Sequence, residues 1–205
     1  MIAPIFKNKE DIKNFPVGEI ACYPWEKDGD IHPESHAAVF AVENEGIHAV
    51  LWSFEDNILC NCTMRDDPVY TDSCLEVFLM PVEGDNRYIN FEVNKNGVYL
   101  SQIGTCRSDR VFIRTLTDLE PIIQTIRITE NGKKAWGYEI IIPEELISAL
   151  YGTDYHICES IIKGNFYKCA ELSENPHFGS FFPVKTEKPD FHRPEFFGDI
   201  EFRKV

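Results

Sequence analysis

The chain has 205 residues, of which 43% are hydrophobic and 13% aromatic, and its formal net charge is -14. This length suits a single domain over residues 1–205, and the apolar content is sufficient for a hydrophobic core, which argues against global disorder. The acidic excess would repel phosphate groups, so we expect no nucleic-acid partner. No apolar run approaches the ~20 residues that a membrane-spanning helix needs, so we expect no membrane partner either.

The N-terminal segment "MIAPIFKNKEDIK" becomes charged within a few residues and lacks the long apolar stretch of a secretory signal. We therefore expect a cytoplasmic protein, or a secreted one if a leader has been removed. The chain contains seven cysteines and no C-x-x-C pair, which favours free thiols over a zinc-finger pattern or a disulfide framework.

The first half of the chain reads as short strands separated by turn residues. "HAAVFAVENEGIHAVLWSFED" predicts two strands around the turn Glu43–Gly46, and "ILCNCTM" predicts another strand. The acidic loop "RDDPVYTD" then leads into "CLEVFLM", which alternates as a buried strand does. "RYINFEVNKNGVYLSQIG" predicts a hairpin that turns at 94–97, where Asn and Gly tolerate positive φ.

The second half repeats this pattern and adds one helix. "RVFIRTL" predicts a strand, and "IIQTIRITENGKKAWGYEIIIP" predicts a hairpin that closes at 130–133. "PEELISALYG" has the proline, first-turn acids and final glycine of a short helix, and "GNFYKCAEL" and "FGDIEFRKV" predict further strands. Many hairpin-linked strands with one short helix predict an all-β fold, an antiparallel β-sandwich of jelly-roll or immunoglobulin-like type.

Two glutamates lie on the same face of two successive strands. Alternation places Glu76 with Cys74 and Phe78, away from the apolar face of its strand, and it places Glu92 with Asn90 in the same way. The two carboxyl groups could be the acid and base of a glycosidase, or they could accept hydrogen bonds from sugar hydroxyls. A third interpretation is that they form ion pairs on a solvated face with arginines of the following segment, Arg107, Arg110 and Arg114.

Aromatic residues occur in the loops next to this face. Tyr70 lies six residues before Glu76, and Phe178, Phe181 and Phe182 cluster in a late loop. Aromatic rings stack on the apolar C–H face of a pyranose, and two rings above a polar floor would form a sugar-binding slot. A single aromatic residue would more often belong to the core.

Two acidic loops could bind calcium. Separately, a histidine near the C-terminus could hold its loop in place through a hydrogen bond. Asp66 and Asp67 lie in one loop, and Glu83 and Asp85 lie in the next. Solvated acidic side chains explain these loops equally simply, so calcium is only a weak candidate cofactor. In "DFHRPEFFG", His192 suggests a local hydrogen bond more than catalysis.

Several of these segments together resemble a known family. "VYTDSCLEVFLMP", "YINFEVNKNG", "GYEIIIPEELI", "GNFYKCAE" and "PDFHRPEFFG" occur in the order seen in carbohydrate-binding module family 9-like proteins. The resemblance extends from about Ala37 to the C-terminus. It implies a β-sandwich that binds the ends of glycans such as xylan or cellulose fragments, often with calcium ions that brace the fold.

The resemblance also implies a set of ligand-binding residues. In the family, two aromatic rings, usually tryptophans, hold the sugar, and acid, amide and arginine groups surround it. The first ring corresponds to Tyr70 and the glutamate to Glu76, while Phe181, with Phe182 beside it, corresponds to the second ring. Arg107 corresponds to the arginine. The smaller rings here should stack more weakly than tryptophan, at ~1 kcal/mol each.

We therefore expect non-catalytic binding of a small saccharide or glycan chain end. Tyr70 and Phe181 would stack on the sugar, and four polar residues would hydrogen-bond its hydroxyls, namely Glu76, Asn90, Glu92 and Arg107. The alternatives are a glycoside hydrolase that uses Glu76 and Glu92, and a protein-interaction domain whose sugar slot has degenerated.

Overall fold

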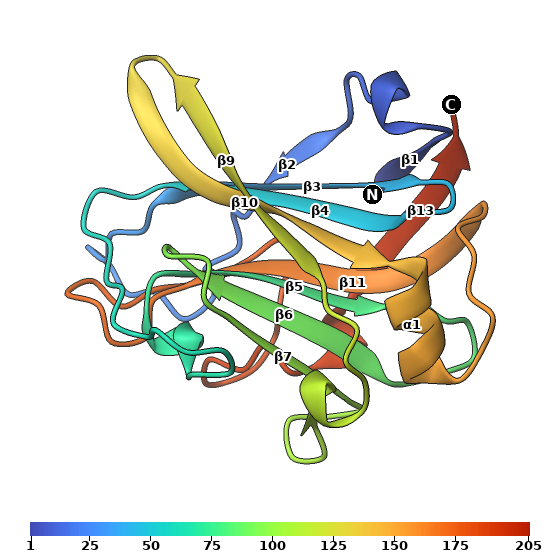
Figure 1. The fold of residues 1–205 in the computed structure, drawn as a ribbon. Coiled ribbons are helices and arrows are strands. Elements are labelled where there is room, and N and C mark those ends of the chain that lie inside the picture. The colour runs from blue at the N-terminus through green and yellow to red at the C-terminus, as the bar shows by residue number, and fades with distance from the viewer.

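The computed structural model describes residues 1–205 and contains thirteen β-strands, one α-helix and four short 3-10 helices (Figure 1). The strands are β1 Ile2–Phe6, β2 Val17–Glu19, β3 Glu34–Val42, β4 Gly46–Phe54, β5 Cys74–Met80, β6 Tyr88–Asn94, β7 Tyr99–Gly104, β8 Val111–Phe112, β9 Ile122–Glu130, β10 Lys133–Pro143, β11 Ser160–Cys169, β12 Phe178–Ser180 and β13 Gly198–Lys204. The helix α1 is Glu144–Tyr151, and the 3-10 helices are Lys9–Asp11, Val69–Thr71, Ile113–Thr115 and Pro194–Phe196.

The strands form one sheet that curls into two layers. The order is β8-β7-β6-β5-β11-β13-β1-β3-β4-β10-β9, with β2 paired to β3 and β12 paired to β11. In Figure 1, β3, β4 and β10 form the upper layer and β5, β6, β7 and β11 form the lower layer. The strands β13 and β1 join the two layers, so the predicted β-sandwich is confirmed.

The main hydrophobic core lies between these layers. Its cluster of 29 buried residues takes alternate side chains from β3, β4 and β10 above and from β5, β6 and β11 below. Leu75, Val77 and Leu79 of β5 are fully buried in it, as are Phe91 of β6 and Phe166 of β11. The inward face of β5 and β6 is therefore apolar, which leaves the opposite face of these strands for the polar residues.

The three predicted hairpins are confirmed. Antiparallel pairs join β3 to β4, β6 to β7, and β9 to β10. Their turns contain residues with positive φ, among them Asn44 (59°), Gly97 (80°) and Asn131 (50°). Glycine and asparagine adopt this conformation more readily than other residues, which is why these turns could be predicted.

Several segments differ from the predictions, among them β2 and β12, which the sequence did not indicate as strands. The sheet is not wholly antiparallel, because β1 pairs in parallel with both β13 and β3. Residues 58–64 are irregular instead of a strand, since the side chains of Asp72 and Ser73 accept hydrogen bonds from three of their backbone N–H groups. In "RVFIRTL" only Val111 and Phe112 are in a strand, and a 3-10 helix follows at once.

The predicted helix is confirmed and covers one end of the sandwich. Gly152 ends α1 in the left-handed conformation, with φ 67°. Glu144, in its first turn, is buried, and its carboxylate accepts a hydrogen bond from the backbone N–H of Ile157 at 2.8 Å, which fixes the chain beyond the helix. The fold contains no helix whose length and apolarity would let it cross a membrane.

Candidate functional site

The outer face of the lower layer carries the two predicted glutamates side by side. Glu76 of β5 is directly paired with Glu92 of β6, so the two side chains project from neighbouring strands in the same direction. Each is only 2% exposed. The expectation that these strands are neighbours is confirmed, and the acids form a buried pair instead of a solvated one.

A cavity of about 110 Å³ lies over this pair. Its wall combines rings, acids and guanidinium groups from five regions of the chain: Tyr70, Glu76, Glu92, Leu100, Gln102, Arg107, Arg110, Cys169, Glu171, Phe178, Pro189, Asp190, Phe191 and His192. The strands β5, β6, β7 and β11 supply the floor, and the loops around Tyr70, Arg107 and Asp190 supply the rim. Four predicted residues, Tyr70, Glu76, Glu92 and Arg107, therefore line one cavity.

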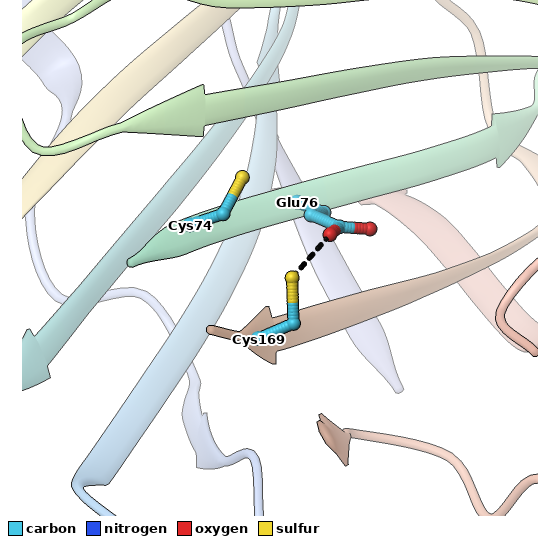
Figure 2. Close-up of side chains that lie close together, drawn as sticks. All are labelled: Cys74, Glu76 and Cys169. Carbon is cyan, nitrogen blue, oxygen red and sulfur yellow. Dashed lines mark hydrogen bonds between the residues drawn. The ribbon is translucent and has the colours of Figure 1, made fainter. Parts of the chain in front are cut away.

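The two carboxyl groups have different neighbours. Glu76 Oε1 accepts a hydrogen bond from the thiol of Cys169, with Sγ and Oε1 2.9 Å apart (Figure 2). Glu92 Oε1 accepts one from the amide of Asn90 at 3.0 Å, whereas Glu92 Oε2 and Asn90 Oδ1 are buried without a partner. Asn90 does not line the cavity, and its observed role is to hold Glu92.

Burial makes both acids easier to protonate than usual. It raises the pKa of Glu92 to about 7, although Arg110 and Arg107 act in the opposite direction. The pKa of Glu76 is also well above its ordinary value, because of burial first and the adjacent Cys169 and Glu92 second. Near neutral pH the floor can therefore donate as well as accept hydrogen bonds.

The basic residues lie at the rim. Arg107 is held by Asp190, whose Oδ1 accepts hydrogen bonds from Nε at 3.0 Å and Nη2 at 2.9 Å. Arg110 donates to Gln102 Oε1 at 2.5 Å, and all four side chains line the cavity. These pairs fix the guanidinium planes while leaving further N–H groups for a ligand, since each guanidinium carries five.

The aromatic side of the cavity consists of Tyr70, Phe178 and Phe191. Tyr70 is 41% exposed, whereas Phe191 is nearly buried, stacked on Tyr167 at a centroid distance of 4.1 Å. Phe178 is half-buried and meets Phe191 edge to face. Tyr70 and Phe178 are thus the two accessible rings of the cavity.

Phe181 and Phe182, the expected second ring and its neighbour, lie elsewhere. Phe181 packs against Phe166 of the main core, at a centroid distance of 5.7 Å. The ring of Phe182 lies over Gly198, where a Cβ atom would come within 2.5 Å of it. Of the three late-loop rings, only Phe178 reaches the cavity; it lies on β12, and Phe181, three residues further along, faces the opposite side of the segment.

Three of the four calcium candidates are engaged by other groups. Asp66 forms an ion pair with Arg114 at 2.8 Å, and Asp67 accepts hydrogen bonds from the backbone of Thr63 and Met64. Asp85 pairs with Arg87, and Glu83 is exposed. None of the four belongs to a cluster of three or more ligating side chains.

His192 fixes the loop above the site, as the sequence suggested. Its Nδ1 lies 3.0 Å from the hydroxyl of Tyr88, and its ring stacks on Phe78. Burial lowers the pKa of His192 to about 2, helped by Arg110 and Arg107, so the imidazole is neutral. The histidine therefore positions the rim and adds no charge to the cavity.

A β-sandwich with aromatic, carboxyl and guanidinium groups around one cavity has the architecture of a ligand-binding module. Within this class, the chain belongs to carbohydrate-binding family 9, whose model matches residues 8–202.

Three solved structures are similar to this one. One is a "putative carbohydrate-binding protein" from Bacteroides uniformis, with a TM-score of 0.79, 24% identity, and coverage of 99% of this chain and 98% of that chain. The others are family 9 modules from Caldicellulosiruptor kristjanssonii. The module in complex with glucose has a TM-score of 0.60, 10% identity, and coverage of 100% of this chain and 96% of that one. The module in complex with cellotriose has a TM-score of 0.59, 11% identity, and coverage of 100% and 94%. A comparison with curated proteins finds no match.

Sequence reasoning named Phe178 among the late-loop rings without choosing it as the second ring, and it missed other cavity residues, chiefly Cys169, Asp190 and Glu171. Cys169 could have been found, since it stands on a predicted strand in an alternating pattern. The others lie in or beside the late loops, whose course depends on the short strand β12 and its pairing with β11. No local pattern in the sequence specifies that pairing.

Proposed function

We propose that the chain binds the terminal sugar of a glucose- or xylose-type glycan, such as a cellulose or xylan fragment, without cleaving it. The observation that carries the proposal is that Tyr70 and Phe178 share one cavity with Glu76 and Glu92. Family membership supports the ligand class, and the structural similarity to modules in complex with glucose and cellotriose supports the kind of sugar.

The cavity suits a neutral sugar on physical grounds. The exposed rings offer flat apolar surfaces for the C–H face of a pyranose. The floor offers a buried carboxyl oxygen without a partner, Glu92 Oε2, which a sugar hydroxyl would satisfy. Arg107 and Arg110 retain N–H donors for hydroxyl or ring oxygens. Each hydroxyl can donate and accept, so a mixed wall of this kind can orient it.

We expect millimolar to micromolar affinity, about -4 to -8 kcal/mol, as for a small neutral ligand in a shallow site. Titration calorimetry with glucose, cellobiose, cellotriose and xylobiose measures this directly. If none of these sugars, and no glycan on an array, binds the folded chain, the proposal is wrong. Self-association of the same sample would then favour a protein-interaction domain.

Removing either ring tests the position of the sugar. Tyr70→Ala and Phe178→Ala should each weaken binding about five-fold, which corresponds to ~1 kcal/mol of stacking. The matched control is Phe15→Ala, since Phe15 is a partly buried ring packed on Phe40 in another cluster. An unchanged affinity in both cavity variants would place the sugar elsewhere.

A glycoside hydrolase is the second candidate, because both acids have raised pKa values, a property of catalytic acids. The arrangement favours it less, since Glu76 and Glu92 stand next to each other on the floor and do not flank a gap. Release of a chromophore from a nitrophenyl glycoside, lost in Glu76→Gln, would establish hydrolysis. We expect no release.

A further inference from the structure

The floor of the cavity contains a compact cluster of three ligating side chains, Cys74, Glu76 and Cys169 (Figure 2). Their sulfur and oxygen atoms all lie within 4.8 Å of one another, and each residue is at least 98% buried. Cys74 and Glu76 share one face of β5 because they are two residues apart, and Cys169 of β11 is paired directly with Cys74.

The residue types and their pairing suit a single thiophilic ion. Two thiolates and a carboxylate are zinc ligands, whereas calcium and magnesium prefer oxygen ligands alone. Directly opposed residues of antiparallel strands have Cβ atoms about 4.5–5.5 Å apart, which exceeds the ~3.8 Å typical of a disulfide. Two metal–sulfur bonds of ~2.3 Å bridge such a gap more easily than one sulfur–sulfur bond.

The cluster is accessible from the cavity. Glu76 and Cys169 both line it, and the sulfur of Cys74, which does not line it, lies within 4.8 Å of their ligating atoms. Glu92 lines the same cavity, is 98% buried, and has an Oε2 atom without a hydrogen-bond partner. A cation at this point would face these two acidic side chains. The positive charges near them are Arg107 and Arg110 at the rim and the buried Lys168, whose Nζ donates to the carbonyl of Cys169 at 2.8 Å and pairs with Glu55.

We propose that Cys74, Glu76 and Cys169 form a binding site for one Zn²⁺ ion at the base of the cavity. Three protein ligands leave one position of a tetrahedral shell for water or for a ligand atom in the cavity. The proposal does not rest on sugar binding. The metal is measured alone, so either proposal can fail without the other.

Binding should be coupled to proton release. Zinc binds cysteine as the thiolate, so each of the two thiols gives up its proton when the ion binds. A bound ion takes the sulfur lone pairs as thiolate ligands, and the two displaced protons pass to the solvent. The affinity for Zn²⁺ should therefore rise as the pH rises.

The test is a titration of the full chain, kept reduced by a phosphine, with Zn²⁺ in competition with a chromophoric chelator. We expect one Zn²⁺ per chain and no competition from Ca²⁺. Titration with Co²⁺ should give thiolate-to-cobalt charge transfer in the near ultraviolet and the intense visible bands of a tetrahedral site. Absence of these bands, or of stoichiometric Zn²⁺ binding, overturns the proposal.

Variants assign the ligands. Cys74→Ser and Cys169→Ser should each weaken Zn²⁺ binding by more than ~100-fold, beyond the 10–100-fold typical of a lost outer-shell partner. Glu76→Gln keeps the side-chain shape, so it tests the site even if a cysteine variant fails to fold. The matched control is Cys158→Ser, an exposed thiol beyond α1, which should leave affinity unchanged. Equal Zn²⁺ affinity in the wild type, Glu76→Gln and Cys169→Ser contradicts the assignment.

Discussion

At the scale of single residues, the buried carboxyl group of Glu92 lowers the stability of the folded protein. The side chain is 2% exposed and one of its carboxyl oxygens has no partner. Burying a charged group without full compensation is unfavourable, which is why its pKa rises to about 7. The folded chain tolerates this group because the rest of the fold supplies the stability.

Replacing Glu92 by Gln should therefore stabilise the protein at pH 8. Between the ordinary pKa of a glutamate and the raised value of about 7, the folded state holds a proton that the unfolded state releases. The free energy of unfolding consequently falls as the pH rises through that window, and the loss is complete above it. The Gln variant has no such loss and should gain of the order of 1–3 kcal/mol at pH 8.

Urea unfolding at pH 4 and pH 8 measures this gain. The two proteins should have similar stability at pH 4, where Glu92 is protonated in both the folded and the unfolded state. The control is Glu174→Gln, an exposed position in the late loop, where we expect no change. A gain of equal size at both pH values would mean that the charge of Glu92 is not the cause.

The two glutamates could be predicted from sequence, but the second ring could not. Alternation holds along β5 and β6 because both strands are paired on each side, so Glu76 and Glu92 had to share a face. Phe178 and Phe181 differ by an odd number of residues, and only the pairing of β12 with β11 decides which of them reaches the cavity. That pairing is a tertiary contact.

At the scale of elements, the segment Ile58–Met64 shows why an apolar pattern is not always a strand. Asp72 accepts hydrogen bonds from the backbone of Asn61 and Cys62, each at 2.9 Å, and from the side chain of Asn94 at 2.9 Å. One buried carboxylate thus takes the place of a neighbouring strand. Local hydrogen bonds of this kind compete with ladder formation, and residue composition does not reveal them.

Asp72→Ala should destabilise the protein by ~3 kcal/mol, since three donors lose a buried acceptor at once. Its position two residues after Tyr70 means that sugar binding should weaken as well. Urea unfolding measures the first effect, and hydrogen exchange of the amides of Asn61 and Cys62 should show faster opening.

Asp67→Ala is the matched control for this prediction. Asp67 also accepts hydrogen bonds from two backbone N–H groups of the same segment, but these bonds are exposed to solvent. Water can replace an exposed acceptor, so we expect a loss of ~1 kcal/mol or less. An equal loss in the two variants would show that burial is not what makes Asp72 important.

The strand β1 was not predicted, because its pairing also depends on contacts that are distant in the chain. Pro4 lacks a backbone N–H group and lowers the expectation of a strand in "IAPIF". The structure places β1 between β13 and β3, with Pro4 paired to Arg203 of β13, while only Ile5 and Phe6 pair with β3. Parallel pairing between strands far apart in the chain has no local sequence pattern, whereas a hairpin can be predicted from its turn residues.

At the scale of the whole molecule, β13 and β1 are the two strands that link the layers into one hydrogen-bonded sheet. One layer ends in β11 and the other in β3, and β13 and β1 stand between them. The cavity floor lies on β5, β6, β7 and β11, and β11 is the strand next to this joint. The geometry of the site therefore depends on β13 and β1, although neither strand contributes a residue to the cavity.

Removing residues 198–205 should unfold the protein as a unit. The deletion exposes the edges of β11 and β1 and removes Ile200 and Phe202, which are fully or almost fully buried in the main core. Losing two such side chains costs ~2–5 kcal/mol each, which together approach the 5–15 kcal/mol that stabilises a typical domain. Circular dichroism should show no cooperative thermal transition.

Deletion of Val205 alone is the control, because this residue is 84% exposed and lies beyond β13, and we expect the normal transition. A cooperative transition in the longer deletion would mean that packing between the layers holds them together without β13.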